Sequence, residues 1–150
     1  MITTESTVPS DLDRYLATHS AGDIPSTADY VERGGSLVTP RTLTHLRALR
    51  QPLRSKIAGL GHNLHLRTGL DLLALYLDEC AAERATLSPA IREAAFAVLY
   101  FLKGFDRIPD SVPEFGLLDD ALIVQCVLDR HAAALRAHWL RRRRQWPLDN

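Results

Sequence analysis

Apolar residues recur every three or four positions along most of this chain, and no stretch alternates with the period of two that a half-buried strand shows. In the clearest segment, leucines at 43, 46, 49, 53 and 60 and the isoleucine at 57 share one helical face. We therefore predict an all-α fold, a small single-domain helical bundle. A chain of 150 residues is long enough to bury one substantial core.

Local signals place the boundaries of several helices. Thr39 before Pro40, and Ser88 before Pro89, each combine a capping side chain with a proline that suits the first helical turn. Pro52 is expected to kink or split the helix that begins near residue 40. The helix over 89–103 is apolar nearly all round, which predicts that it is the central, most buried helix.

The domain organisation follows from the same patterns. Residues 1–38 contain only short helical patterns, one of them ending at Gly34 and Gly35, and predict a weakly ordered N-terminal arm with short helices. Residues 39–150 are predicted to form the helical domain. A helical hairpin of residues 89–103 and 117–145 is expected at its centre.

Four aspartates, Asp106, Asp110, Asp119 and Asp120, lie in the tract FLKGFDRIPDSVPEFGLLDD between two apolar runs. One interpretation is a rigid elbow, in which proline-stiffened bends and the start of the next helix use the carboxylates as backbone-amide acceptors. In the other, the carboxylates converge on a divalent cation such as Mg²⁺, Mn²⁺ or Ca²⁺, or act as an acid–base pair. Since caps and turns are the commoner use of aspartate, the elbow is favoured.

Residues 100–124, YFLKGFDRIPDSVPEFGLLDDALIV, resemble the signature of the YkvA-like family, catalogued as domain of unknown function 1232. The shared pattern is an apolar helix, then D-x-I-P-D, then P-x-x-G-x-x-D-D, then a second apolar helix. Lys103 and Gly104 depart from it. The resemblance implies a small helical hairpin, often membrane-associated, and it implies no established activity.

The last helix is predicted to run from about Leu117 to Trp146, roughly 45 Å at the usual rise per residue. A helix of this length exceeds what one small core covers, so its end is expected to project. A protein partner or a second copy of the chain would then bind there. The candidate interface residues are Leu135, His138, Trp139, Arg141, Arg142, Arg143 and Arg144.

The formal charge is zero overall but strongly segregated. Residues 33–70 contain seven bases and no acid, whereas residues 71–120 contain ten acids and four bases. Arginines beside a leucine face are compatible with binding to an anionic membrane surface. They are less compatible with binding to nucleic acid, because few aromatic residues lie among the bases. In the alternative interpretation, these arginines are only the solvated edge of the core.

The sequence leaves open whether the chain is an enzyme. We expect a non-enzymatic interaction or accessory module that acts on a protein partner or a membrane surface. The alternatives are a metal-dependent protein or enzyme that uses the four aspartates, and a nucleic-acid-binding protein. Cys80 and Cys126 lack CxxC spacing, so we expect both to be buried free thiols. Free thiols indicate a reducing cytoplasm, and the protein could also lie there against the inner face of the membrane.

Overall fold

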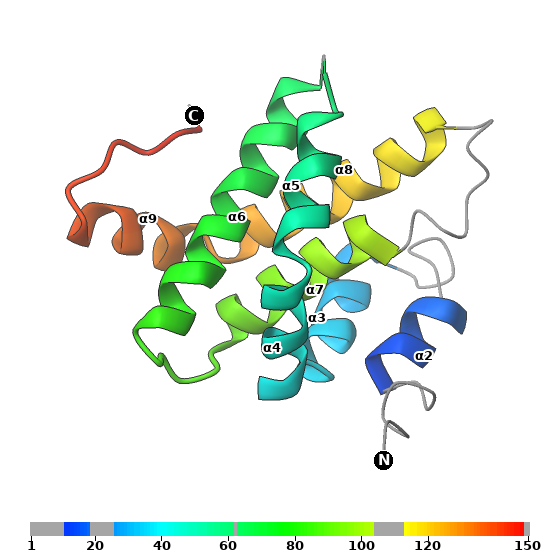
Figure 1. Ribbon diagram of the computed structural model, residues 1–150, viewed down its shortest axis with the longest axis horizontal. Helices are drawn as coiled ribbons and strands as arrows, with labels where there is room; N and C mark the ends of the chain where they lie inside the picture. The colour runs from blue at the N-terminus through cyan, green and yellow to red at the C-terminus, as the bar shows by residue number, and fades with distance from the viewer. Residues whose placement is uncertain (1–10, 19–25, 62, 104–112, 149–150) are drawn as a thin grey trace.

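The computed structural model describes residues 11–18, 26–61, 63–103 and 113–148, with the backbone alone at 13, 16–18, 103 and 113–119. These residues form helices and no strand, which confirms the all-α prediction (Figure 1). Within the described ranges, no helix is long and apolar enough to cross a bilayer. The helices are α2 (Asp11–Thr18), α3 (Thr27–Ser36), α4 (Pro40–Ala48), α5 (Arg50–Ala58), α6 (Leu64–Ala82), α7 (Pro89–Lys103), α8 (Pro113–Arg130) and α9 (Ala132–Arg141).

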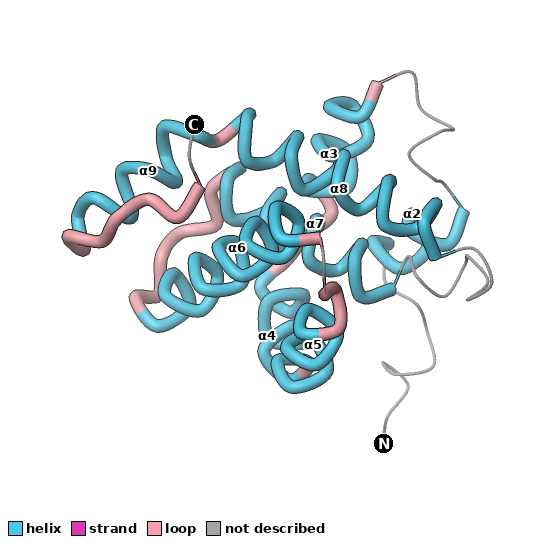
Figure 2. Tube along the Cα trace, turned by 90° about the horizontal axis from the view of Figure 1, so that it is seen from above, coloured by secondary structure: helices cyan, strands magenta, loops and turns pink. Residues whose placement is uncertain are grey.

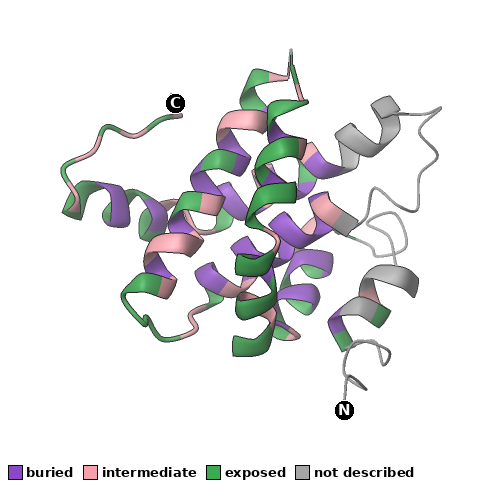
Figure 3. Cartoon of the chain, viewed as in Figure 1, coloured by how far each residue is buried: buried purple, intermediate pink, exposed green. Residues whose placement is uncertain are grey.

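Helix α7 is the centre of the bundle, as its composition predicts. It contacts α3, α4, α6 and α8, and every residue from Glu93 to Phe101 is buried (Figure 3). The Ser88 hydroxyl accepts a hydrogen bond from the Ile91 amide at 3.2 Å and caps the start of the helix. A helix that meets neighbours on several sides has little surface left for solvated polar residues, which explains its apolar run from Ala94 to Leu102.

Helices α4 and α5 divide where the sequence indicates. Thr39 and Thr42 form a reciprocal capping box at the start of α4. The helix breaks at Leu49, three residues before Pro52, because a proline in a helix interior removes a hydrogen bond and clashes with the preceding turn. Leu46, Leu53 and Ile57 are buried, so the leucine face of these two helices belongs to the core.

Helix α3, which lies within the segment predicted as an N-terminal arm, packs into the core. Tyr30 and Val31 are fully buried in the same hydrophobic core as α7. The helix also continues through Gly34 and Gly35 instead of ending there. Their role is close packing, because a Cβ at Gly34 would overlap the Phe96 ring, and one at Gly35 would lie 2.7 Å from Glu93 Cγ.

The C-terminal segment is two helices, so the prediction of one projecting 45 Å helix was wrong. The break falls at His131, whose φ and ψ of −119° and 25° are not helical. After α9, Arg143 has a positive φ of 53° and the Arg144 amide donates to the Trp139 carbonyl, which turns the chain back. Trp146 then lies edge-on to Trp139, with ring centroids 5.6 Å apart. Figure 2 shows α9 and this returning segment at the end of the molecule opposite α2.

Candidate functional site

The aspartate junction lies largely outside the described residues. Asp106 and Asp110 fall outside them entirely, and at Asp119 only the backbone is described, as part of α8. Asp120 is described and is 4% exposed. Within the described ranges, no three His, Cys, Asp or Glu side chains form a group that could hold a metal ion. The elbow, the divalent cation and the acid–base pair therefore stay predictions.

Lys56 fixes the point at which the chain enters this junction. Its ammonium group donates to the carbonyl oxygens of Phe101 at 2.5 Å and Leu102 at 3.4 Å, and it lies over the Phe101 ring. A cation is favourable at a helix C-terminus, where the last carbonyls lack intrahelical partners. Lys56 thus ties α5 to the end of α7, a role that sequence analysis did not assign to it.

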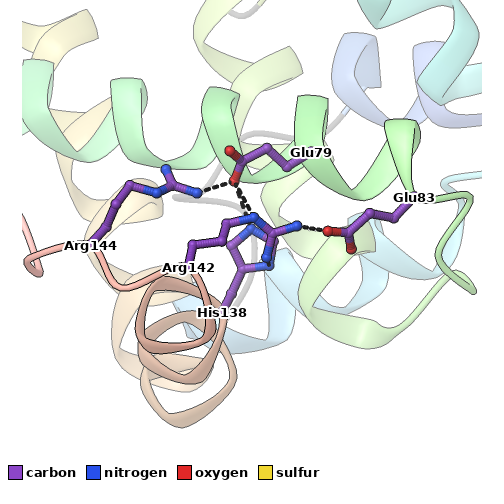
Figure 4. A network of polar contacts seen from close by, with 5 residues as sticks. All are labelled: Glu79, Glu83, His138, Arg142 and Arg144. Carbon is purple, nitrogen blue, oxygen red and sulfur yellow. Dashed lines mark hydrogen bonds and ion pairs between the residues drawn. The ribbon is translucent and has the colours of Figure 1, made fainter.

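A partly buried polar cluster joins α6 to α9 and the returning segment (Figure 4). One carboxylate oxygen of Glu79 accepts from His138 Nε2 at 2.8 Å and from Arg144 at 2.6 Å. Arg142 lies 3.3 Å from the same oxygen through Nε and also pairs with Glu83. We call Glu79, His138, Arg142 and Arg144 the Glu79 cluster.

The hydrogen bonds of His138 define its tautomer. Its Nδ1 lies 3.3 Å from a guanidinium nitrogen of Arg142, and arginine has no acceptor, so Nδ1 must accept and Nε2–H must donate to Glu79. Burial raises the pKa of Glu79, but the hydrogen bonds from Arg144 and His138 outweigh it and hold the pKa below its ordinary value of 4.5. Through these contacts the cluster connects α6 with α9 and with the segment that follows α9.

This arrangement corrects the premise of the candidate interface. Leu135, His138 and Trp139 are 0%, 1% and 4% exposed, so these side chains are inside the molecule and not on a projecting helix. Arg142 and Arg144 are engaged by Glu79 and Glu83. Arg141 and Arg143 are exposed. The stripe that was read as an interface is covered by the chain itself, because His138 packs against Tyr76 and Glu79 of α6, and Trp146 of the returning segment packs on Trp139.

A second polar cluster lies deeper, on α7. Glu93 is 5% exposed through its side chain and is held by Arg130 through two bonds of 2.8 and 3.0 Å. His131 Nε2 lies 2.9 Å from the same carboxylate. Burial raises the pKa of Glu93, and the Arg130 and His131 hydrogen bonds outweigh this effect and leave the pKa below 4.5. We call these three residues the Glu93 cluster. Its signal in the sequence is a lone acid in an otherwise apolar helix, which requires a buried partner.

Neither cysteine is placed for chemistry. Cys80 is buried and Cys126 is half-buried, and both are free thiols, as predicted. Burial raises the pKa of both thiols, which disfavours the reactive thiolate.

A groove lies on the side of α6 opposite the Glu79 cluster. One wall is α4–α5 and the other is α6, with Val98 of α7 at the bottom. It encloses about 160 Å³, less than a typical small-molecule pocket, so it is a shallow groove. Its apolar lining includes Leu43, Leu46, Leu53, Ile57, Ala74, Leu75, Leu77 and Ala81. Leu75 is 39% exposed within it.

The rims of the groove carry charges of opposite sign. Arg47, Arg50 and Arg54 line the α4–α5 side, and Asp71 and Asp78 line the α6 side. Arg50 bridges to Asp78 at 2.9 Å. For Arg47, Arg54 and Asp71, no ion pair is formed with any part of the chain that the structure describes. The groove therefore combines an apolar floor with two unpaired arginines on one edge.

Comparison with known families bears on the middle of the chain. The matching model is that of the DUF1232 family, described as a protein of unknown function. Residues 90–125 match it. This stretch runs from α7 through the aspartate junction into α8 and confirms the resemblance predicted from residues 100–124. No curated protein and no solved structure gives a significant match. Apart from Val98, the residues that line the groove lie outside the matched stretch.

Proposed function

We propose that this chain is a non-enzymatic helical interaction module whose groove between α4–α5 and α6 binds a segment of a partner protein. The observation that carries the proposal is the groove itself, a shallow and mostly apolar hollow of about 160 Å³ that leaves Leu75 partly exposed. Apolar surface left in a concave site is favourably covered by another molecule. The rim arginines add polar contacts around this apolar floor, as in known protein interfaces.

A protein partner fits this site better than a membrane does. An amphipathic helix binds a bilayer by inserting its apolar face, but Leu46, Leu53 and Ile57 are 4–8% exposed and already occupied by the core. The apolar surface that remains is at the bottom of a groove, which a flat bilayer does not enter. Binding to nucleic acid has less support, because Arg142 and Arg144 of the C-terminal arginine run are engaged by carboxylates.

The test compares two leucine variants of equal chemistry. Leu75→Gln places an amide in the groove, and Leu140→Gln makes the same change on α9, where the side chain is 77% exposed and does not line the groove. Neither substitution alters the charge. Partners are captured by cross-linking in cells, and the melting temperature of each variant is measured in parallel.

We expect a partner that the parent chain and Leu140→Gln both capture, and that Leu75→Gln loses without unfolding. Equal capture by both variants would overturn the proposal. Flotation with anionic liposomes that depends on Leu75 would assign the groove to a membrane instead.

A further inference from the structure

We propose that the partner segment is an amphipathic helix with one acidic flank, and that its carboxylates bind Arg47 and Arg54. This inference rests on the proposed function, because it names the ligand class of the same groove. It concerns residues that the matched family stretch does not contain.

The length of the groove suits a short helix. The α6 wall extends from Asp71 to Ala81, ten residues apart, which is about 15 Å at the rise of an α-helix. A guest helix laid beside α6 would cover this distance in nearly three turns. Three turns present apolar anchors at positions i, i+3 or i+4, and i+7, which is the common pattern when a helix binds in a groove.

The lining can accept such anchors along its whole length. Leu43, Leu46 and Leu53 come from one wall, and Ala74, Leu75 and Ala81 come from the other. The small side chains of Ala74 and Ala81 alternate with larger ones on α6, so this wall has an uneven surface. Two walls of helix, with α7 behind them, form the kind of site in which ridges of one helix fit between those of others.

The rim charges determine which flank of the guest is acidic. Arg47 and Arg54 lie on the α4–α5 side, one on each side of Arg50, whose guanidinium is already paired with Asp78. The surrounding segment 33–70 has seven bases and no acid, so every charged side chain that this rim contributes to the groove is positive. Asp71 lies on the other rim and would repel a carboxylate there. The guest therefore places its acids toward α4–α5.

The experiment uses the full chain and three fluorescent helical peptides of about three turns. All share one leucine face, and their flank positions carry Glu, Gln or Lys. Binding is measured by fluorescence anisotropy at low and high salt. Vesicles of mixed phosphatidylserine and phosphatidylcholine serve as the membrane probe.

Two double variants remove equal charge from different surfaces. Arg47→Gln with Arg54→Gln changes the groove rim, and Arg141→Gln with Arg143→Gln changes exposed arginines on α9 and just after it. We expect the Glu peptide to bind about fivefold tighter than the Gln peptide, since exposed ion pairs are individually weak. The Lys peptide should bind more weakly than either. The advantage of Glu should vanish in the groove variant and at high salt, and persist in the α9 variant.

Each other outcome overturns the inference in a distinguishable way. Equal binding of the Glu and Gln peptides, lost in Leu75→Gln, keeps the groove as a binding site but removes its preference for acids. Binding by none of the peptides rejects an amphipathic helix as the ligand, while partner capture still decides the proposed function. Vesicle binding that depends on Arg47 and Arg54, without peptide binding, assigns the rim to a membrane.

Discussion

The two sides of α6 use charged residues in opposite ways. Toward α9, Glu79 is surrounded by His138, Arg142 and Arg144, and deeper in the molecule Glu93 is enclosed by Arg130 and His131. Toward α4–α5, Arg47 and Arg54 have no described carboxylate partner, and the one bridging pair is exposed to solvent. We call these the closed side and the open side.

The contrast between paired and exposed charges indicates that different residues of this fold serve stability and recognition. A buried carboxylate must be matched by donors, because an unpaired charge in the interior is expensive. A solvated arginine carries no such requirement and keeps its charge available to another molecule. Substitutions on the closed side should therefore change folding, and those on the open side should change binding.

The largest effect is expected for Glu93→Ala. Removing this carboxylate leaves Arg130 and His131 without their partner beside the core, and breaking a buried ion pair in this way costs about 4 kcal/mol. The free energy of unfolding is measured by urea denaturation. Glu83→Ala is the control, since its side chain is 49% exposed and its pairing with Arg142 should contribute below about 1 kcal/mol. Similar losses of unfolding free energy in both variants would show that the buried carboxylate of Glu93 contributes no more to stability than an exposed one.

Trp139→Ala should follow, with a loss of about 3 kcal/mol from the cavity that it leaves. Trp139 is 4% exposed and packs edge-on against Trp146, so the residue expected at an interface is a core residue. Thermal unfolding and size-exclusion chromatography are measured together. A change in association with unchanged stability would restore the interface interpretation. Trp146→Ala, at the half-buried edge of the same pair, should cost less.

Gly34→Ala should destabilise the chain by about 2 kcal/mol, since the new methyl group overlaps the Phe96 ring and forces the core to shift. The matched change on the open side is Gly59→Ala. There the φ is −78° and the nearest atom to a Cβ is 3.5 Å away, so the free energy of unfolding should change by less than about 0.5 kcal/mol. Equal effects in a denaturant titration would show that α3 packs on α7 less closely than the structure describes.

The pH dependence of the closed side should follow its two depressed carboxyl pKa values. A glutamate whose folded pKa is lowered stabilises the fold above its unfolded pKa, and the contribution is lost as the pH falls through the folded pKa. The difference in unfolding free energy between the parent chain and Glu93→Gln should therefore shrink below about pH 4.5, the ordinary glutamate value.

Glu79→Gln should behave in the same direction, because its pKa is also lowered. Denaturation midpoints between pH 3 and pH 7 test this expectation, in the range where glutamates titrate. A difference that stays constant across the range would contradict the assignment of ionised, hydrogen-bonded carboxylates to both clusters.

Local signals in the sequence predicted the features that depend on neighbouring residues. Thr39 and Ser88 cap the first turns of α4 and α7, and Pro52 lies three residues after the break at Leu49. Each of these residues acts within one helical turn of its own position. The sequence of residues 89–103, which is apolar nearly all round, likewise predicted the central helix, because such a helix is buried on most of its surface.

The features that were missed depend on residues far apart in the sequence. The partners of Glu79 are 59 to 65 residues away, and those of Glu93 are 37 and 38 residues away. The break at His131 has no glycine or proline to mark it. At this break, Arg130 and His131 bind the carboxylate of Glu93, while His138 binds that of Glu79. The break therefore depends on tertiary contacts and not on a local sequence signal. Gly34 and Gly35 were read as a helix stop because close packing against Phe96 and Glu93 is not visible locally.

The smallest effect on stability is expected for Arg50→Gln, which removes the ion pair that bridges the two rims of the groove. Arg50 and Asp78 are 46% and 34% exposed, so water replaces the lost contact and the free energy of unfolding should fall by about 0.5 kcal/mol or less. The effect on binding should be larger than the effect on stability, because Asp78 becomes an unpaired acid beside the groove and repels an acidic guest. Urea denaturation and anisotropy with the Glu peptide test the two halves of this expectation. A loss of stability as large as that of Glu93→Ala would mean that the open side holds the fold together, and the division between stability and recognition would fail.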